Sequence, residues 1–251
     1  NRVGPKRVSR VRIPLSPPPY SHLMTVNQKN ILEWAQKITK DIYLEFKKYD
    51  WEYGIKVFYT PVTQDNPPLV LISYQPGGDR GYYEREDKNN FEAGNFLPQE
   101  KNVYCIVENA MSRHIRALFQ CAPNFLDQMV AFPLIFFRAP DVKTWKREMG
   151  DRRKYVENFC FEKVKEILNR LKPKKIVILG IDTYLLMVRK SILMDVKDEK
   201  EILGVKNNRR LAITSMIGKQ KIFAMLHPTG ARISKEDRDA IQREFCKWIQ
   251  N

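Results

Sequence analysis

Two polar residues stand where they could take part in a reaction, because each directly follows a run of apolar residues. Gln75 follows the apolar run 69–74, and His227 follows the apolar run 222–226. An imidazole can donate a hydrogen bond to an oxygen that gains negative charge during a reaction. An amide can orient a water molecule, although it cannot usefully accept a proton near pH 7. We therefore regard His227 and Gln75 as candidate catalytic residues.

Two glycines and a carboxylate follow Gln75. Gly77 and Gly78 would let backbone amides approach a phosphate or a sugar, or they serve only to form a tight turn. Asp79 is the nearest carboxylate in this loop, and it either assists catalysis or is a turn residue paired with Arg80.

The two candidate residues would meet if the runs before them are strands of one sheet. Buried strands are predicted at 69–74, 130–137, 176–180, 211–214 and 222–226, with a shorter strand at 57–60. Apolar residues at helical spacing predict helices over 27–48 and 156–171 and at the C-terminus. This alternation predicts a three-layer α/β/α sandwich with a central, mostly parallel sheet. Such sheets bind ligands at the carboxyl ends of their strands, so both segments are expected at one edge.

The composition indicates a polyanionic partner. The chain has 251 residues, of which 44 are Lys or Arg and 29 are Asp or Glu, which gives a net charge of +15. A field of this sign favours nucleic acid, although charge alone does not separate DNA from RNA or an acidic membrane face. No apolar run approaches the roughly 20 residues that span a bilayer. We therefore expect no membrane association and a cytoplasmic protein, in a prokaryotic cytosol.

Length and composition predict one domain over 24–251, and we expect a monomer. The segment 1–23 is basic, contains no acidic residue and includes a proline run, so it is predicted to be flexible or not native to the protein. Its residues 10–14 can be back-translated into a sequence that reads like the T-arm of a transfer-RNA gene. Translation would then begin at Met24, in a gene beside a site where mobile elements integrate, and a defence role would be favoured.

The four cysteines indicate neither a metal site nor a cofactor. Cys105, Cys121, Cys160 and Cys246 are widely spaced, with no C-x-x-C pair and no histidine at zinc-finger distance. We expect free, buried thiols, no bound metal and no cofactor.

Together, the order of the motifs resembles the uracil-DNA glycosylase superfamily. A buried strand ends in Gln-Pro-Gly-Gly at 75–78, a helix leads through 171–175 into a strand ending at Gly180, and a last strand ends in His-Pro-Thr at 227–229. In that superfamily an Asp or Asn precedes the first proline, and the second motif is His-Pro-Ser. The resemblance extends from about residue 69 to the C-terminus, and it implies a monofunctional DNA glycosylase that cleaves an N-glycosidic bond and leaves an abasic site.

The resemblance also assigns roles to particular residues. His227 would donate a hydrogen bond to the leaving base, and Gln75, with help from Asp79, would orient the attacking water. The base must be flipped out of single- or double-stranded DNA into a pocket. The pocket residues would be Tyr74, Phe91, Phe132 and Pro133, with Phe91 as the stacking ring. The residues that contact DNA would be Gly77, Gly78, Thr229, Arg232, Ile233 and Lys235, with Arg232 or Ile233 as the wedge and Lys235 on phosphate.

One departure from the superfamily bears on the substrate. Uracil-specific members carry an Asn in the second buried strand, where Phe132 or Pro133 stands here. Neither can form the hydrogen bonds that distinguish uracil from other pyrimidines. The substrate is therefore expected to be a modified pyrimidine, such as the hypermodified cytosine of phage DNA, with the polar insertion 79–99 enlarging the pocket for an antiviral role.

Three alternatives stay open. The first is ordinary uracil excision in base excision repair. The second is a catalytically silent DNA-binding module, which would keep salt-dependent affinity but release no base. The third is a nucleotide-binding α/β protein, which neither a Walker A sequence nor a G-x-G-x-x-G fingerprint supports.

Overall fold

A six-stranded mixed sheet forms the centre of the computed structural model, which describes residues 25–204, 208–229 and 231–251. The strand order is β2-β1-β3-β6-β5-β4. The first four strands in this order are parallel to one another, whereas β5 and β4 run antiparallel to their neighbours. The strands are β1 (Leu69–Ser73), β2 (Val130–Pro133), β3 (Lys175–Leu179), β4 (Val196–Leu203), β5 (Arg210–Ile217) and β6 (Gln220–Met225). The basic segment 1–23 lies outside the described residues.

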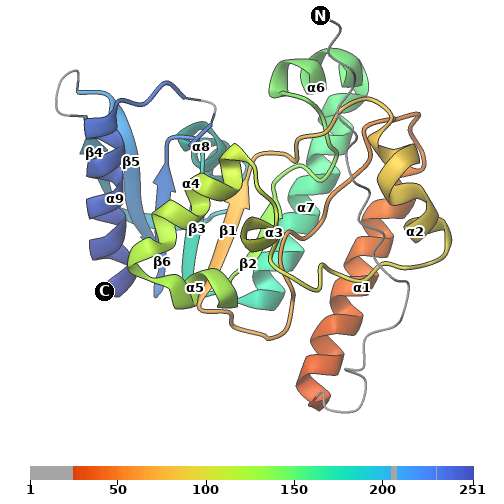
Figure 1. Cartoon of the computed structure of the whole chain (residues 1–251), viewed down its shortest axis with the longest axis horizontal. Coiled ribbons are helices and arrows are strands. Elements are labelled where there is room, and N and C mark those ends of the chain that lie inside the picture. The colour runs from red at the N-terminus through yellow and green to blue at the C-terminus, as the bar shows by residue number, and fades with distance from the viewer. Residues whose placement is uncertain (1–24, 205–207, 230) are drawn as a thin grey trace, which may run out of the picture.

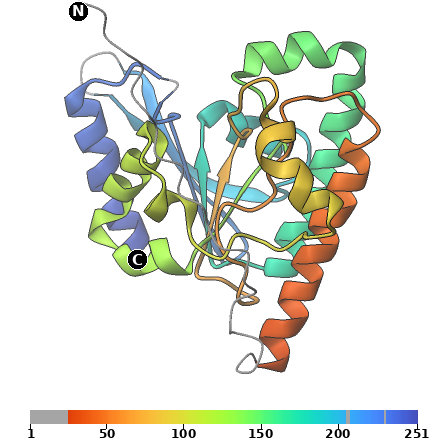
Figure 2. The same ribbon diagram turned by 45° about the vertical axis from the view of Figure 1, so that its right-hand side comes forward.

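Helices cover both faces of the sheet (Figures 1 and 2). The longer helices are α1 (Val26–Phe46), α4 (Ala110–Leu118), α6 (Val142–Met149), α7 (Arg153–Leu171), α8 (Ile181–Arg189) and α9 (Lys235–Gln250). The shorter ones are α2 (Lys88–Glu92), α3 (Val103–Ile106) and α5 (Pro123–Gln128), with single turns η2 (Tyr83–Asp87), η3 (Phe119–Cys121) and η4 (Gly150–Arg152). The predicted α/β/α sandwich is confirmed at this level.

The alternation of side chains along β1 explains the two layers. Val70 and Ile72 pack into a core with α1, α7 and α8, while Leu69 and Leu71 pack into a second core with α4, η3 and α9. Every residue of β1 is buried, because the strand lies in the interior of the sheet with helices over both faces. Continuous apolar runs are typical of such strands, which is why the sequence identified them.

Three expectations about the elements were wrong. The segment 57–60 is not a strand; it bonds to the sheet irregularly, for example from Tyr59 N to Ala131 O at 2.8 Å. The strand expected over 130–137 ends at Pro133, and the chain then turns so that Leu134 N donates to Ser73 O. The edge strand β4 was missed, because its exposed and mostly charged residues give no apolar pattern.

The expectation of four free thiols was also wrong. Cys121 and Cys246 form a disulfide between η3 and α9, with their Cα atoms 5.9 Å apart, a usual separation for such a bond. Their 125-residue separation in sequence gave no sign of this pairing. Cys160 is a buried free thiol as expected, whereas Cys105 is free but exposed. None of the described helices is long and apolar enough to cross a membrane.

Arg138 connects three irregular segments that surround the end of β1. Its Nε donates to Ile55 O at 3.1 Å and its Nη1 donates to Gly77 O at 2.7 Å. Asp87, at the end of η2, lies 3.8 Å from Nε, and the ring of Tyr82 lies 4.1 Å from the guanidinium carbon. The side chain is buried, so these partners replace the water that it loses. Arg138 therefore fixes the loop that follows β1.

We expect Arg138→Met to lower the free energy of unfolding by about 3–5 kcal/mol, because two carbonyls and a buried carboxylate would lose their partner. Chemical denaturation measures this loss. Arg147→Met is the control, since Arg147 is exposed and pairs only locally with Glu148, and it should cost under about 0.5 kcal/mol. Equal losses in the two variants would contradict the role given to Arg138.

Candidate functional site

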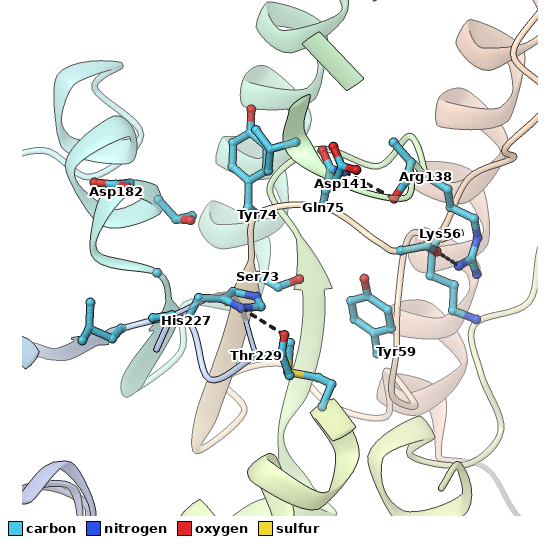
Figure 3. Close-up of a pocket in the computed structure, with 18 of the residues that line it drawn as sticks. Lys56, Tyr59, Ser73, Tyr74, Gln75, Arg138, Asp141, Asp182, His227 and Thr229 are labelled. Carbon is cyan, nitrogen blue, oxygen red and sulfur yellow. Dashed lines mark hydrogen bonds between the residues drawn. The ribbon is translucent and has the colours of Figure 1, made fainter. Parts of the chain in front are cut away.

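A cleft of about 2040 Å³ lies at the carboxyl ends of β1, β3 and β6. Ser73 and Gln75 reach it from β1, Gly180 from β3, and His227 from β6. Figure 3 shows the end of β1 in the middle of this cleft, with His227 on one side and Lys56 and Arg138 on the other. The prediction that both polar segments share one edge of the sheet is thus confirmed.

Basic side chains predominate in the lining of the cleft. Among the described residues, nine Lys or Arg and three Asp or Glu line it. The basic residues are Lys56, Arg138, Lys146, Arg153, Arg189, Lys190, Arg209, Arg210 and Arg232, and the acidic ones are Asp141, Glu157 and Asp182. A concave surface with this imbalance concentrates positive potential and attracts anionic ligands.

His227 is held in a defined orientation at the head of its loop. The Thr229 hydroxyl lies 3.3 Å from His227 Nδ1, and Ala231 N donates to the His227 carbonyl at 3.2 Å. Burial lowers the pKa of His227 below its usual value, because the charged ring would lose hydration. The imidazole is therefore neutral at pH 7. If the Thr229 hydroxyl donates to Nδ1, the ring proton is on Nε2.

Gln75 places a buried acceptor at the cleft. Its Nε2 lies 3.5 Å from Ala139 O, at the limit of a hydrogen bond. Its Oε1 is buried and has no hydrogen-bond partner among the described residues. Buried polar atoms nearly always have a partner, which can be a water molecule. The amide oxygen is thus a buried acceptor beside the cleft whose hydrogen-bonding capacity the described residues leave unused.

The two glycines of the loop have different surroundings. Gly77 lines the cleft, and a Cβ added there would meet no atom within 4 Å. A Cβ on Gly78 would approach Cβ and Cδ of Arg138 to 3.2 Å. Of the two, only Gly77 has the space that close approach of a ligand requires, while Gly78 is needed for packing against Arg138.

Asp79 does not lie in the cleft, against expectation. Both of its carboxylate oxygens accept from Arg85 Nη2 at 2.8 Å, and its side chain is exposed outside the lining residues. The expected pairing with Arg80 is absent as well, because Arg80 bonds to Glu52 and Glu148 instead. The carboxylates that do line the cleft come from segments that sequence reasoning did not consider.

Those three carboxylates differ in their hydrogen bonds and in their exposure to the cleft. Asp141 caps α6 and accepts from Thr144 N at 2.7 Å, a bond that lowers the pKa of Asp141. Glu157 lies 3.7 Å from Arg153. Asp182, in the first turn of α8, is exposed to the cleft. Asp141 and Asp182 are exposed, whereas Glu157 is half-buried, so the first two are the better candidates for assisting water or stabilising a cation.

Most of the expected base pocket is also placed differently. Phe91 does not line the cleft, because its ring stacks on Tyr43 of α1 with centroids 4.9 Å apart. Phe132 and Pro133 belong to β2 and are buried in the sheet rather than in the cleft wall. The insertion 79–99 folds largely onto α1, so it does not enlarge the cleft as expected; only Tyr82 and Gln99 of this segment line it.

Of the expected pocket residues, only Tyr74 lines the cleft, and three other tyrosines join it there. They are Tyr59, Tyr82 and Tyr104. Burial raises the pKa of Tyr59 to about 12 and also raises the pKa values of Tyr74, Tyr82 and Tyr104, so all four rings are neutral phenols at pH 7. Neutral aromatic rings with a hydroxyl can stack on a planar ligand and bond to its edge. The sequence signal for Tyr59 was the run 57–60, which had been expected to form a short strand.

The loop after β6 contributes part of its expected contacts. Thr229 and Arg232 line the cleft. Ile233 packs against the core beneath α9, and Lys235 begins α9 outside the lining residues. Of the two wedge candidates, Arg232 lines the cleft and Ile233 does not. Exposed apolar side chains also line the cleft and had not been singled out: Ile106, Val107, Val142 and Leu185.

The two glycines provide a stability test of this geometry. Gly78→Ala should lower the free energy of unfolding by about 1–3 kcal/mol, because the methyl group crowds Arg138. Gly77→Ala should leave it unchanged within about 0.5 kcal/mol, since its Cβ enters open space. Urea denaturation of both variants checks the difference, and a larger loss at Gly77 would show that the loop is packed differently.

Comparison with known proteins does not assign this chain to a family. No protein-family model matches the sequence, and no curated protein is significantly similar to it. The function must therefore be argued from the residues of the cleft.

Proposed function

We propose that this protein is a DNA glycosylase that flips a modified pyrimidine out of DNA, hydrolyses its N-glycosidic bond and leaves an abasic site. The observation that carries the proposal is the meeting of His227 and Gln75 in one positively charged cleft. The resemblance of the loop motifs to the uracil-DNA glycosylase superfamily supports it, as does the α/β sandwich on which the loops are arranged.

The charge of the cleft suits a DNA backbone. Its basic residues come from the segments before β1 and after β2, from α6, α7 and α8, and from the start of β5 and the loops beside β5 and β6, so they border the cleft on several sides. Contacts of Lys and Arg with phosphate supply most of the salt-dependent affinity for nucleic acid. A DNA strand bound in this cleft would place the sugar and base of one nucleotide near the carboxyl ends of β1 and β6.

His227 is suited to stabilise the leaving base. Cleavage of the bond places negative charge on the base and oxocarbenium character on the sugar. A neutral imidazole whose Nε2–H points at the base oxygen stabilises the first of these charges without first giving up a proton. Thr229 assists by holding Nδ1. Gln75 Oε1 would accept a hydrogen bond from the attacking water, and Asp141 or Asp182 would face the sugar cation.

The side chains that line the cleft indicate which kind of base it would accept. No side-chain amide from β2 lines it to read a uracil edge; Gln75 and Asn109 are among the amides that line it elsewhere. Tyr59, Tyr74 and Tyr82 offer ring faces and hydroxyl groups instead. A cleft of about 2040 Å³ also leaves room for a bulky substituent on the base. We therefore favour a modified pyrimidine, with phage hypermodified cytosine as the first candidate, in an antiviral role.

A base-release assay tests the proposal. Purified protein is incubated with uracil-containing DNA and, separately, with phage DNA that contains modified cytosines. Abasic sites are then cleaved with alkali and released bases are identified by mass spectrometry. We expect release from the modified DNA only. Release of uracil would point to ordinary repair, and tight, salt-dependent binding without release from either DNA would point to a silent binding module.

The His227→Ala variant should reduce base release about 10²–10³-fold, because one donor to the developing anion is lost. His114→Ala is the matched control, since His114 lies on α4 outside the cleft lining and should keep the wild-type rate. Asp79→Asn should also leave the rate unchanged, whereas a large loss there would show that the water-activating group is misplaced.

Thr229 gives a finer test of the same mechanism. Thr229→Val removes the hydroxyl beside Nδ1 and should slow base release about fivefold, the effect of one neutral hydrogen bond. Thr229→Ser keeps the hydroxyl and should stay within about twofold of the wild-type rate. Single-turnover kinetics measure both rates. Equal rates for the two variants would mean that the hydroxyl does not orient the imidazole.

A further inference from the structure

Lys56 is a cleft residue that the mechanism above does not use. It lies in the irregular segment before Tyr59, and its backbone is fixed by a 2.9 Å hydrogen bond from Lys56 N to Phe136 O. Figure 3 shows its side chain beside Arg138 and Tyr59, on the wall opposite His227. The amine thus lines the same cleft as the proposed catalytic residues.

The surroundings of Lys56 are unusual for a lysine. No carboxylate of the described residues lies within ion-pair distance of its Nζ, although Asp87 acts on it from further away. The guanidinium of Arg138 is the other charge that acts on it, and it repels the ammonium form. Tyr59 and Tyr82, which line the cleft nearby, remain neutral. Burial and Arg138 together lower the pKa of Lys56 to about 8.

A lysine in this setting is a nucleophile at neutral pH. With a pKa of about 8, roughly a tenth of the side chain is the free amine at pH 7, against a few in ten thousand for an ordinary lysine. Desolvation beside a second cation is a known way to prepare a lysine for attack on a carbonyl. A lysine that served only to hold phosphate would gain nothing from losing its charge.

We propose that Lys56 forms an imine with the aldehyde of the abasic site left in the cleft and cleaves the DNA strand on the 3′ side. This activity rests on the proposed function and extends it, because the sequence alone led us to expect a monofunctional enzyme. The carbonyl compound is the ring-opened C1′ aldehyde of the abasic deoxyribose.

The chemistry requires no oxidant and no reductant. The free amine adds to C1′, and loss of water with uptake of one proton from the solvent gives a protonated imine. The C2′ hydrogen then leaves as a proton to water, the C3′–O bond breaks, and the 3′ phosphate departs with the electron pair. Hydrolysis of the unsaturated imine frees Lys56 and releases a strand that ends in an unsaturated aldehyde.

Borohydride trapping tests the proposal independently of base excision. The full-length protein is mixed with DNA in which the abasic site was made beforehand, and borohydride reduces any imine to a stable amine. We expect a covalent protein–DNA adduct that peptide mapping assigns to Lys56, and an at least tenfold lower yield with Lys56→Arg. Lys143→Gln is the matched control, since Lys143 is an exposed lysine of α6 outside the cleft lining and this variant should be trapped like the wild type.

Two further readouts separate this role from a structural one. Lys56→Arg should bind DNA containing tetrahydrofuran, an abasic analogue without an aldehyde, as the wild type does. Trapping by the wild type should increase with pH around a midpoint of about 8, set by the same amine. A pH-independent yield of the Lys56 adduct would contradict the role given to the free amine.

The outcomes distinguish the two proposals. Base release without an adduct, in protein that binds the tetrahydrofuran DNA, overturns the role of Lys56 and keeps the glycosylase. An adduct at Lys56 without release from any modified DNA keeps the lyase step and overturns base excision. An adduct mapped to another amine, including the N-terminus, also overturns the assignment to Lys56.

Discussion

The buried guanidinium of Arg138 is the interaction on which the rest of the cleft depends. A charge taken out of water is tolerated only where other polar groups replace its hydration, and here those groups are the carbonyls of Ile55 and Gly77. Each carbonyl belongs to a segment that has no regular secondary structure of its own. One side chain thus fixes both the loop that carries Gln75 and the segment that carries Lys56. Arg138 also determines the local electrostatic potential. A cation at this position disfavours the charged form of a second basic group nearby and attracts anions to the end of β1.

The two walls of the cleft consequently have different electrostatic character. On the wall of β6, burial keeps the imidazole of His227 neutral. On the opposite wall, Lys56 beside Arg138 is partly neutral. In both places burial favours the neutral form of a basic group, whereas an arginine guanidinium is always charged in proteins. A neutral donor and a free amine therefore line one cleft in which the net charge is still positive.

Sequence reasoning succeeded where one physical signal dominates. The interior strands were predicted because burial on both faces leaves continuous apolar runs, and α1 and α7 because one buried face leaves helical spacing. The meeting of Gln75 and His227 followed from the rule that ligands bind at the carboxyl ends of parallel strands. The edge strand β4 has neither signal, since its side chains are mostly exposed and charged. Phe91 looked like a pocket residue because aromatic type alone does not distinguish a ring on a helix from one in a cleft.

Three cleft residues that sequence reasoning missed lie in irregular segments that border apolar runs: Lys56, Tyr59 and Arg138. In such segments the sequence has no periodicity that would show which way a side chain points. Their placement depends on contacts between residues far apart in the sequence. Arg138 Nη1 donates a hydrogen bond to Gly77 O, 61 residues away, and Ile55 forms an antiparallel β-bridge with Phe137. The regular strands position His227 and Gln75 through their own ladder, whereas the opposite wall depends on hydrogen bonds between irregular segments, including those of the buried Arg138. Changes in the wall around Arg138 can therefore alter the ligand that the cleft accepts while the sheet stays intact.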